Sequence, residues 1–140
     1  MITTIDDVKV ISLQKYTDER GTLVPVELEK DNNAVFKRSF FVFDVPKSQT
    51  RGYHAHKKSE QLLICPTGRC TVIVRDGSRS RNISLDSPEK CIHIPAMIWN
   101  EILYEEEGTL LIALATERYS KKEYILDWQE FANTKSERGK

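Results

Sequence analysis

The sequence predicts an all-β protein, a sandwich or barrel of about ten short strands followed by one short helix. Three observations predict this fold class. Short apolar runs recur along the chain, several of them alternate apolar and polar residues as half-buried strands do, and turn-forming residues stand between them. The length of 140 residues is that of one domain with a core of its own.

The strands are expected where the apolar runs lie. In chain order these runs cover residues 8–13, 21–28, 36–45, 52–56, 60–66, 69–77, 80–85, 90–95, 100–105 and 108–117. Gly, Pro, Asp, Glu and Ser separate them, most clearly at 18–21, 66–68, 76–77, 86–88 and 105–108. No repeat or linker interrupts the series, so the sequence predicts a single domain over residues 1–132.

Only the end of the chain has a helical pattern. Apolar residues recur there at spacings of three and four residues: Tyr124, Ile125, Trp128 and Phe131. This spacing predicts a helix within 120–135 that follows Ser120 as N-cap and packs on the barrel rather than binding a ligand. Residues 133–140 are polar, and we expect a frayed tail there.

The composition restricts the partners and the location. Lys and Arg together number 21, as do Asp and Glu, so no net charge draws the chain to nucleic acid or to a membrane. The N-terminus lacks signal-peptide features, and no apolar run approaches the roughly 20 residues that span a bilayer. Three cysteines without CxxC spacing, Cys65, Cys70 and Cys91, are typical of buried thiols in a reducing cytosol, so a cytoplasmic protein is expected.

The most informative stretch is RGYHAHKKSEQLLI, residues 51–64. His54 and His56 are separated by one residue, so on a strand both rings point to the same face. Glu60 follows four residues later. These residues alone leave three interpretations open: metal ligands completed by Glu60, a catalytic pair, or two imidazoles on a solvated face.

This stretch and a second one resemble the two sequence motifs of the cupins. The first has the pattern His-x-His-x3-Glu with Gly68 eight residues after the glutamate, and the second, PAMIWN, covers residues 95–100. The resemblance implies a cupin jelly roll, which is a double-stranded β-helix. The chain departs from the pattern at Asn100, where the last cupin histidine is expected, and at Met97, where glycine is common. Asparagine is a weaker metal ligand than imidazole, which favours a polar site without metal.

Six segments together resemble the dTDP-sugar 3,4-ketoisomerases, which are small cupin enzymes. In order these are DERGTL (18–23), FKRSFFVFDV (36–45), RGYHAHKK (51–58), the glycine turn at 68, PAMIWNE (95–101) and YILDWQEF (124–131). The resemblance covers essentially the whole chain, and Arg-Gly-aromatic-His-Ala-His-Lys is its most specific motif. It implies an isomerase that converts dTDP-4-keto-6-deoxyglucose to the 3-keto isomer, for deoxyamino sugars such as those of O-antigen and lipopolysaccharide. It also implies a homodimer with exchanged N-terminal strands, and neither metal nor other cofactor.

The chemistry of this reaction fits a histidine pair. Moving a ketone from carbon 4 to carbon 3 through an enediol needs a base with a pKa near neutrality and a second group that donates to the developing oxyanion. We assign His54 as the base and His56 as the donor or shuttle. The other interpretation is that one of the two rings only orients the other.

Two departures from the ketoisomerase pattern affect the proton relay. Phe40 stands where the family commonly has tyrosine, and Asn100 where it commonly has histidine. Three interpretations follow: other groups such as Tyr53, Tyr104 or water rebuild the relay, the enzyme is slow or has another stereochemical outcome, or the protein binds the nucleotide sugar without turnover. Asn100 can still donate a hydrogen bond to a ketone oxygen.

The diphosphate of a dTDP-sugar needs local cations, and arginine binds phosphate oxygens as a planar fork. Arg20, Arg38 and Arg51 all stand in strand or turn segments expected near a barrel mouth. The resemblance favours Arg20 first, reaching across a dimer, and Arg51 second. For the thymine ring the stacking candidates are Trp99, Tyr53 and Phe41, with Trp99 equally suited to the core.

Two alternatives to the metal-free isomerase therefore remain. The first is a metal-dependent cupin enzyme that uses His54, His56 and Glu60. The second is a non-catalytic cupin that binds a dTDP-sugar, which the absent tyrosine and histidine would explain.

Overall fold

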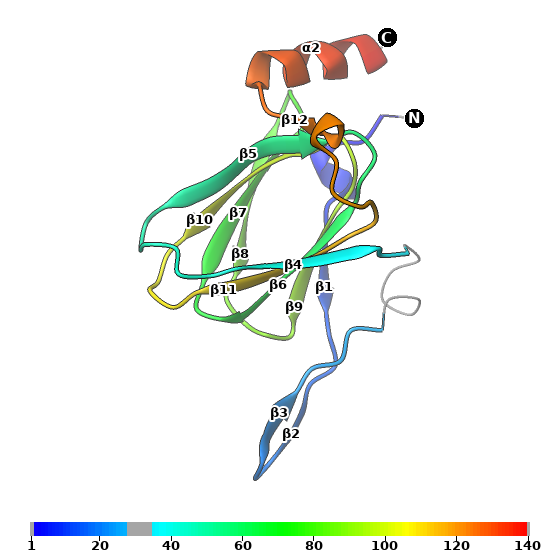
Figure 1. Ribbon diagram of the computed structural model, residues 1–140. Coiled ribbons are helices and arrows are strands. Elements are labelled where there is room, and N and C mark those ends of the chain that lie inside the picture. Colours follow the sequence, from blue (N-terminus) through cyan, green and yellow to red (C-terminus); the bar gives the residue numbers. More distant parts are fainter. Residues whose placement is uncertain (1, 28–34, 140) are drawn as a thin grey trace.

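The computed structural model describes residues 2–27 and 35–139, and their strands form two facing five-stranded antiparallel sheets (Figure 1). The first sheet has the order β1 (Lys9–Ser12), β9 (Lys90–Ile94), β6 (Gln61–Thr67), β11 (Leu110–Ala115) and β4 (Arg38–Val42). The second has the order β12 (Tyr124–Ile125), β5 (Thr50–His56), β10 (Trp99–Tyr104), β7 (Cys70–Arg75) and β8 (Ser80–Leu85). The predicted all-β jelly roll with a short C-terminal helix is confirmed.

Each of the ten predicted runs overlaps a strand. The last residue of the run 21–28 lies outside the described residues. Two strands were not predicted. Of these, β2 (Tyr16–Asp18) pairs with β3 (Gly21–Leu23) across the predicted turn at 18–21, and β12 pairs with β5.

The core lies between the two sheets because alternate side chains of each strand point inward. In β7 the residues Cys70, Val72 and Val74 are all fully buried, whereas the residues between them are partly exposed. From the opposite sheet, Leu63 and Ile92 belong to the same buried cluster. Each such aliphatic side chain contributes about 1.5–3 kcal/mol of burial free energy, so this cluster holds the sheets together.

The C-terminal segment differs from the predicted helix. Helix α2 covers Trp128–Arg138, and Asp127 caps it by accepting a hydrogen bond from the Glu130 backbone at 2.8 Å. Lys121–Glu123 forms a 3-10 turn, and Tyr124 and Ile125 extend the sheet instead of joining the helix. The helix continues past residue 133, where a frayed tail was expected. Lys135 is buried and donates to the backbone oxygen and the hydroxyl of Thr3.

The β2–β3 hairpin projects from the barrel at the end opposite α2 (Figure 1). All six residues of its strands are exposed, including Tyr16 and Leu23. In the described part of the chain no helix has both the length and the apolar character needed to cross a bilayer.

Candidate active site

The histidine pair follows a bulge in β5. The pairing of β5 with β10 shifts register there, because Asn100 lies opposite His54 while the next residue of β10 lies opposite Gly52. Gly52 and Tyr53 both have left-handed backbone angles, with φ of 99° and 60°. A Cβ at residue 52 would lie 2.9 Å from the carbonyl oxygen of Asn100, so only glycine fits this approach. The bulge thus sets the direction in which His54 points.

The two imidazoles lie together, as the alternation on a strand predicts. The ring centroids of His54 and His56 are 5.0 Å apart in an edge-to-face arrangement. His56 is 5 % exposed, and within the part of the chain that the structure describes neither of its ring nitrogens has a hydrogen-bond partner. A buried polar group without a partner costs about 1–3 kcal/mol. Such groups are uncommon outside functional sites, so this ring is a functional candidate.

Burial favours the neutral form of both imidazoles. It lowers the pKa of His54, while a hydrogen bond with the backbone of Gly52 acts in the opposite direction. The pKa of His56 is lowered further, to about 3, by burial first and then by the charges of His54 and Arg38. His54 is therefore the ring that accepts a proton more readily, and His56 remains a neutral imidazole that can donate its N–H.

A cavity of about 90 Å³ opens between the sheets beside His54. Its polar lining comprises Arg51, His54, Gln61, Asn100 and Tyr104. Apolar side chains close the remainder: Phe40, Val42, Leu63, Ile102 and Leu111. A small, partly enclosed space with a few polar groups on apolar walls can shield a reacting group from water, and of the two histidines only His54 lines it.

The two departures from the ketoisomerase pattern lie in this cavity. Phe40 and Asn100 both line it. Asn100 is 1 % exposed, and its side-chain amide donates to the backbone oxygen of His54 at 3.5 Å. A histidine at residue 100 or a tyrosine at residue 40 would therefore face the same space as His54.

The structure brings three further predicted residues to the site. Arg51 and Tyr104 line the cavity, and burial raises the pKa of Tyr104, which keeps its hydroxyl protonated. Arg38 lies over the ring of Phe40, with 4.5 Å between its guanidinium carbon and the ring centroid. These groups can donate hydrogen bonds to a bound sugar or phosphate.

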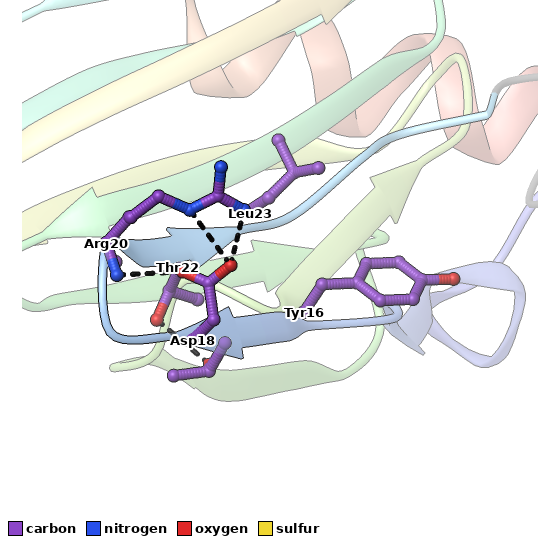
Figure 2. Close-up of a pocket in the computed structure, with 7 residues that line it drawn as sticks. Tyr16, Asp18, Arg20, Thr22 and Leu23 are labelled. Atoms are coloured by element: carbon purple, nitrogen blue, oxygen red, sulfur yellow. Dashed lines mark hydrogen bonds and ion pairs between the residues drawn. The ribbon is translucent and has the colours of Figure 1, made fainter.

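The other predicted residues lie elsewhere. Trp99 is 4 % exposed and packs under α2 against Trp128 and Phe131, with ring centroids 5.3 Å and 5.7 Å away, so it is a core residue. Tyr53 and Phe41 are exposed side chains that do not line the cavity. Figure 2 shows that Arg20 folds back on Asp18 at the tip of the projecting hairpin, 2.6 Å between their charged atoms.

The three residues of the expected cupin metal motif do not gather. Glu60 lies 2.7 Å from Nε2 of His93, a histidine of β9 in the other sheet from the pair. Among the described residues no group of three or more His, Cys, Asp or Glu side chains is arranged to hold a metal ion. The ligand set of the metal-dependent alternative is therefore not assembled.

Two residues of the site were not identified from the sequence. Gln61 is buried and lines the cavity, although its place at the start of an apolar run marks it only as a strand residue. Tyr124 packs against both imidazoles, with ring centroids 4.5 Å from His56 and 5.1 Å from His54. The spacing of four residues between Tyr124 and Trp128 predicted a helix, whereas Tyr124 lies in strand β12.

Comparison with known proteins gives a consistent assignment. The model of the family described as "FdtA: WxcM-like, C-terminal" matches residues 6–136. A TDP-4-oxo-6-deoxy-alpha-D-glucose-3,4-oxoisomerase of Aneurinibacillus thermoaerophilus is 37 % identical over 123 residues, which is 88 % of each chain. The chain belongs to this FdtA-like family.

Solved structures of relatives agree with this membership. The sugar 3,4-ketoisomerase QdtA of Thermoanaerobacterium thermosaccharolyticum, in complex with TDP, is 31 % identical with a TM-score of 0.90, covering 94 % of this chain and 96 % of QdtA. A QdtA variant with one histidine replaced by asparagine, in complex with TDP-4-keto-6-deoxyglucose, is 30 % identical with the same TM-score of 0.90 and the same coverage, 94 % and 96 %. QdtA thus binds TDP, and its asparagine variant binds TDP-4-keto-6-deoxyglucose.

Proposed function

We propose that this protein isomerises TDP-4-keto-6-deoxyglucose to its 3-keto isomer through an enediol. The observation that carries the proposal is the half-buried imidazole of His54, which lines a cavity that also holds polar groups and has the buried ring of His56 5.0 Å away, in a chain of this family. The product is a 3-keto sugar ready for amination, so the protein would serve deoxyamino-sugar synthesis, including that of O-antigen and lipopolysaccharide. Its three buried cysteines fit a cytoplasmic location.

The reaction needs only proton transfers. His54 removes the proton from carbon 3, the electron pair moves toward the carbon-4 carbonyl oxygen, and that oxygen takes up a proton to give the enediol. Loss of the proton from the carbon-3 hydroxyl and addition of one at carbon 4 then gives the 3-keto sugar. His56 does not line the cavity, and its ring lies 5.0 Å from that of His54, so it serves as the donor or shuttle behind His54. Its pKa of about 3 keeps its imidazole neutral near pH 7.

The tyrosine that Phe40 replaces has a candidate substitute in the cavity. Tyr104 lines the cavity, and its raised pKa keeps the hydroxyl protonated, so it can donate to the carbonyl or enediol oxygen. Tyr53 lies in the bulge with its side chain half exposed, which favours Tyr104 for this role. The side-chain amide of Asn100 is a second donor at the same cavity.

The diphosphate is expected to contact Arg51 and Arg38 of one chain and Arg20 of a second copy. In the single chain, Arg20 stands on a hairpin that projects from the barrel (Figure 1). The apolar residues Tyr16 and Leu23 of that hairpin are 56 % and 64 % exposed. A homodimer with exchanged N-terminal strands would cover these residues and carry Arg20 to a partner's site.

An exchange experiment tests the proposed reaction. The chelator-treated protein is incubated with TDP-4-keto-6-deoxyglucose in heavy water, and the sugar protons are followed by NMR. We expect loss of the carbon-3 proton signal together with a new 3-keto species. His54→Asn should lower the rate by at least about 100-fold, because it removes the base. His93→Asn is the matched control, since it removes an imidazole on β9 and should retain the wild-type rate.

The outcomes separate the alternatives. TDP binding without exchange would indicate the non-catalytic sugar-nucleotide protein. Exchange that appears only after divalent metal is added would indicate the metal-dependent enzyme. Equal rates for His54→Asn and the wild type would reject His54 as the base.

A further inference from the structure

Tyr124 lies where three parts of the site meet. It pairs with His56 across β12 and β5. Its ring contacts His54 and His56 at centroid distances of 5.1 Å and 4.5 Å, and those two rings are 5.0 Å apart. Each of the three rings therefore touches the other two, and neither imidazole can rotate far without displacing the tyrosine.

The hydroxyl of Tyr124 makes a second connection. It accepts a hydrogen bond from Nη1 of Arg38 at 3.2 Å. The guanidinium of Arg38 also lies over the rings of Phe40 and Tyr119, at 4.5 Å and 5.1 Å from their centroids. Tyr124 thus links β4 of the first sheet to β5 of the second.

His56 needs such a neighbour because hydrogen bonds do not orient its ring. A functional imidazole usually donates one N–H to a carboxylate or a backbone oxygen, and that bond sets its tautomer and direction. In the chain as described, both ring nitrogens of His56 are buried without a partner. Packing is then what holds the ring, and the nearest aromatic ring is that of Tyr124.

We propose that Tyr124 is a positioning residue of the site: its ring holds the imidazoles of His54 and His56 in their mutual arrangement, and its hydroxyl holds the guanidinium of Arg38. The two parts are separable by substitution. Tyr124→Phe removes the hydroxyl and keeps the ring, whereas Tyr124→Leu removes both. The effect on turnover rests on the proposed isomerase activity, but the effect on the histidine rings does not.

NMR of the histidine rings tests the first part without substrate. The chain has three histidines, so the ring signals can be assigned one by one, and His93, which is bound to Glu60, serves as the internal control. Tyr124→Leu should shift the signals of His54 and His56 and leave those of His93 in place. Tyr124→Phe should change them little, because the ring current remains. Unchanged His54 and His56 signals in Tyr124→Leu would overturn the proposal.

Kinetics test the consequence for the reaction. Tyr124→Leu should lower kcat at least about tenfold, because misplaced catalytic groups slow the chemical step. Tyr124→Phe should keep kcat and raise KM about three- to tenfold, because Arg38 loses one hydrogen bond that holds it. Tyr124→Leu with an unchanged kcat would contradict this role. If Tyr124→Leu fails to fold, Tyr124→Met provides the same test with a longer apolar side chain. If the wild-type protein shows no exchange, the proposed function fails and the ring signals still decide the position of Tyr124.

Discussion

His54 and His56 show how two identical side chains, one residue apart, acquire different properties. His54 is half-buried and His56 is buried, and the charge of Arg38 further lowers the pKa of His56. His54 keeps a backbone hydrogen bond with Gly52 that favours its protonated form. The difference in environment therefore separates the ring that accepts a proton from the ring that donates one.

The lowered pKa of His56 predicts a specific loss of stability in acid. An unfolded histidine binds a proton below about pH 6.5, while folded His56 remains neutral down to about pH 3. The unfolded state thus binds more protons in this window, and the stability contribution falls by about 1.4 kcal/mol for each pH unit below 6.5. Urea unfolding between pH 7 and pH 4.5 should show a steeper decline for the wild type than for His56→Asn. Parallel declines would contradict the pKa assigned to His56.

At the scale of elements, the turn that precedes β10 has an unusual backbone angle. Met97, between β9 and β10, has a φ of 62°, the conformation for which the cupin motif commonly has glycine. Its backbone N–H donates to the carbonyl of His56 at 2.8 Å, so this turn fixes the end of β5. The side chain is buried with Ala55, Trp99 and Phe131, and this packing offsets the strain of the left-handed backbone.

This strain predicts that glycine at residue 97 is at least as stable as alanine, which is the reverse of the usual order. Met97→Ala and Met97→Gly should both destabilise the fold by about 2–4 kcal/mol, because each removes a buried side chain. Only glycine relieves the left-handed strain, so Met97→Gly should be at least as stable as Met97→Ala. Ala55→Gly in the neighbouring strand is the control and should show the ordinary loss of about 1 kcal/mol. Thermal unfolding measures all four proteins, and a Met97→Ala protein more stable than Met97→Gly would contradict the argument.

The elements that the sequence predicted are those with an internal pattern. Strands such as β7 alternate apolar and polar residues, and this alternation is visible without tertiary information. The two-residue strand β12 is too short to have a period, and only its pairing with β5 forms it. Tyr124 therefore could not be placed beside the histidines from the sequence. The placement of His54 beside His56 could be predicted, because it depends only on the two-residue repeat of one strand.

The molecule as a whole exposes apolar surface around its N-terminal segment. A groove of about 560 Å³ on the first sheet is lined mainly by apolar side chains: Thr22, Val24, Val26, Ile64, Pro66, Pro88, Ile112 and Leu114. The projecting hairpin ends at the exposed Leu23, and the segment that follows it continues into this groove. A second copy seated here would bury the groove, and its hairpin would carry Arg20 to a cavity that the single chain leaves without it.

Complementation between two impaired chains tests this arrangement. If Arg20 acts across the dimer, a heterodimer of His54→Asn with Arg20→Ala contains one complete site, in which His54 comes from one chain and Arg20 from the other. Heterodimers isolated through two different affinity tags should then recover about half of the wild-type exchange rate at low substrate, as one intact site of two requires. If Arg20 acts within its own chain, the exchange rate of the heterodimer should not exceed that of the Arg20→Ala protein.

Light scattering measures the oligomeric state on which this arrangement depends. Ile112→Asp places a charge in the apolar groove and should shift the protein from dimer to monomer. A monomeric wild type would remove the basis for Arg20 as a diphosphate ligand.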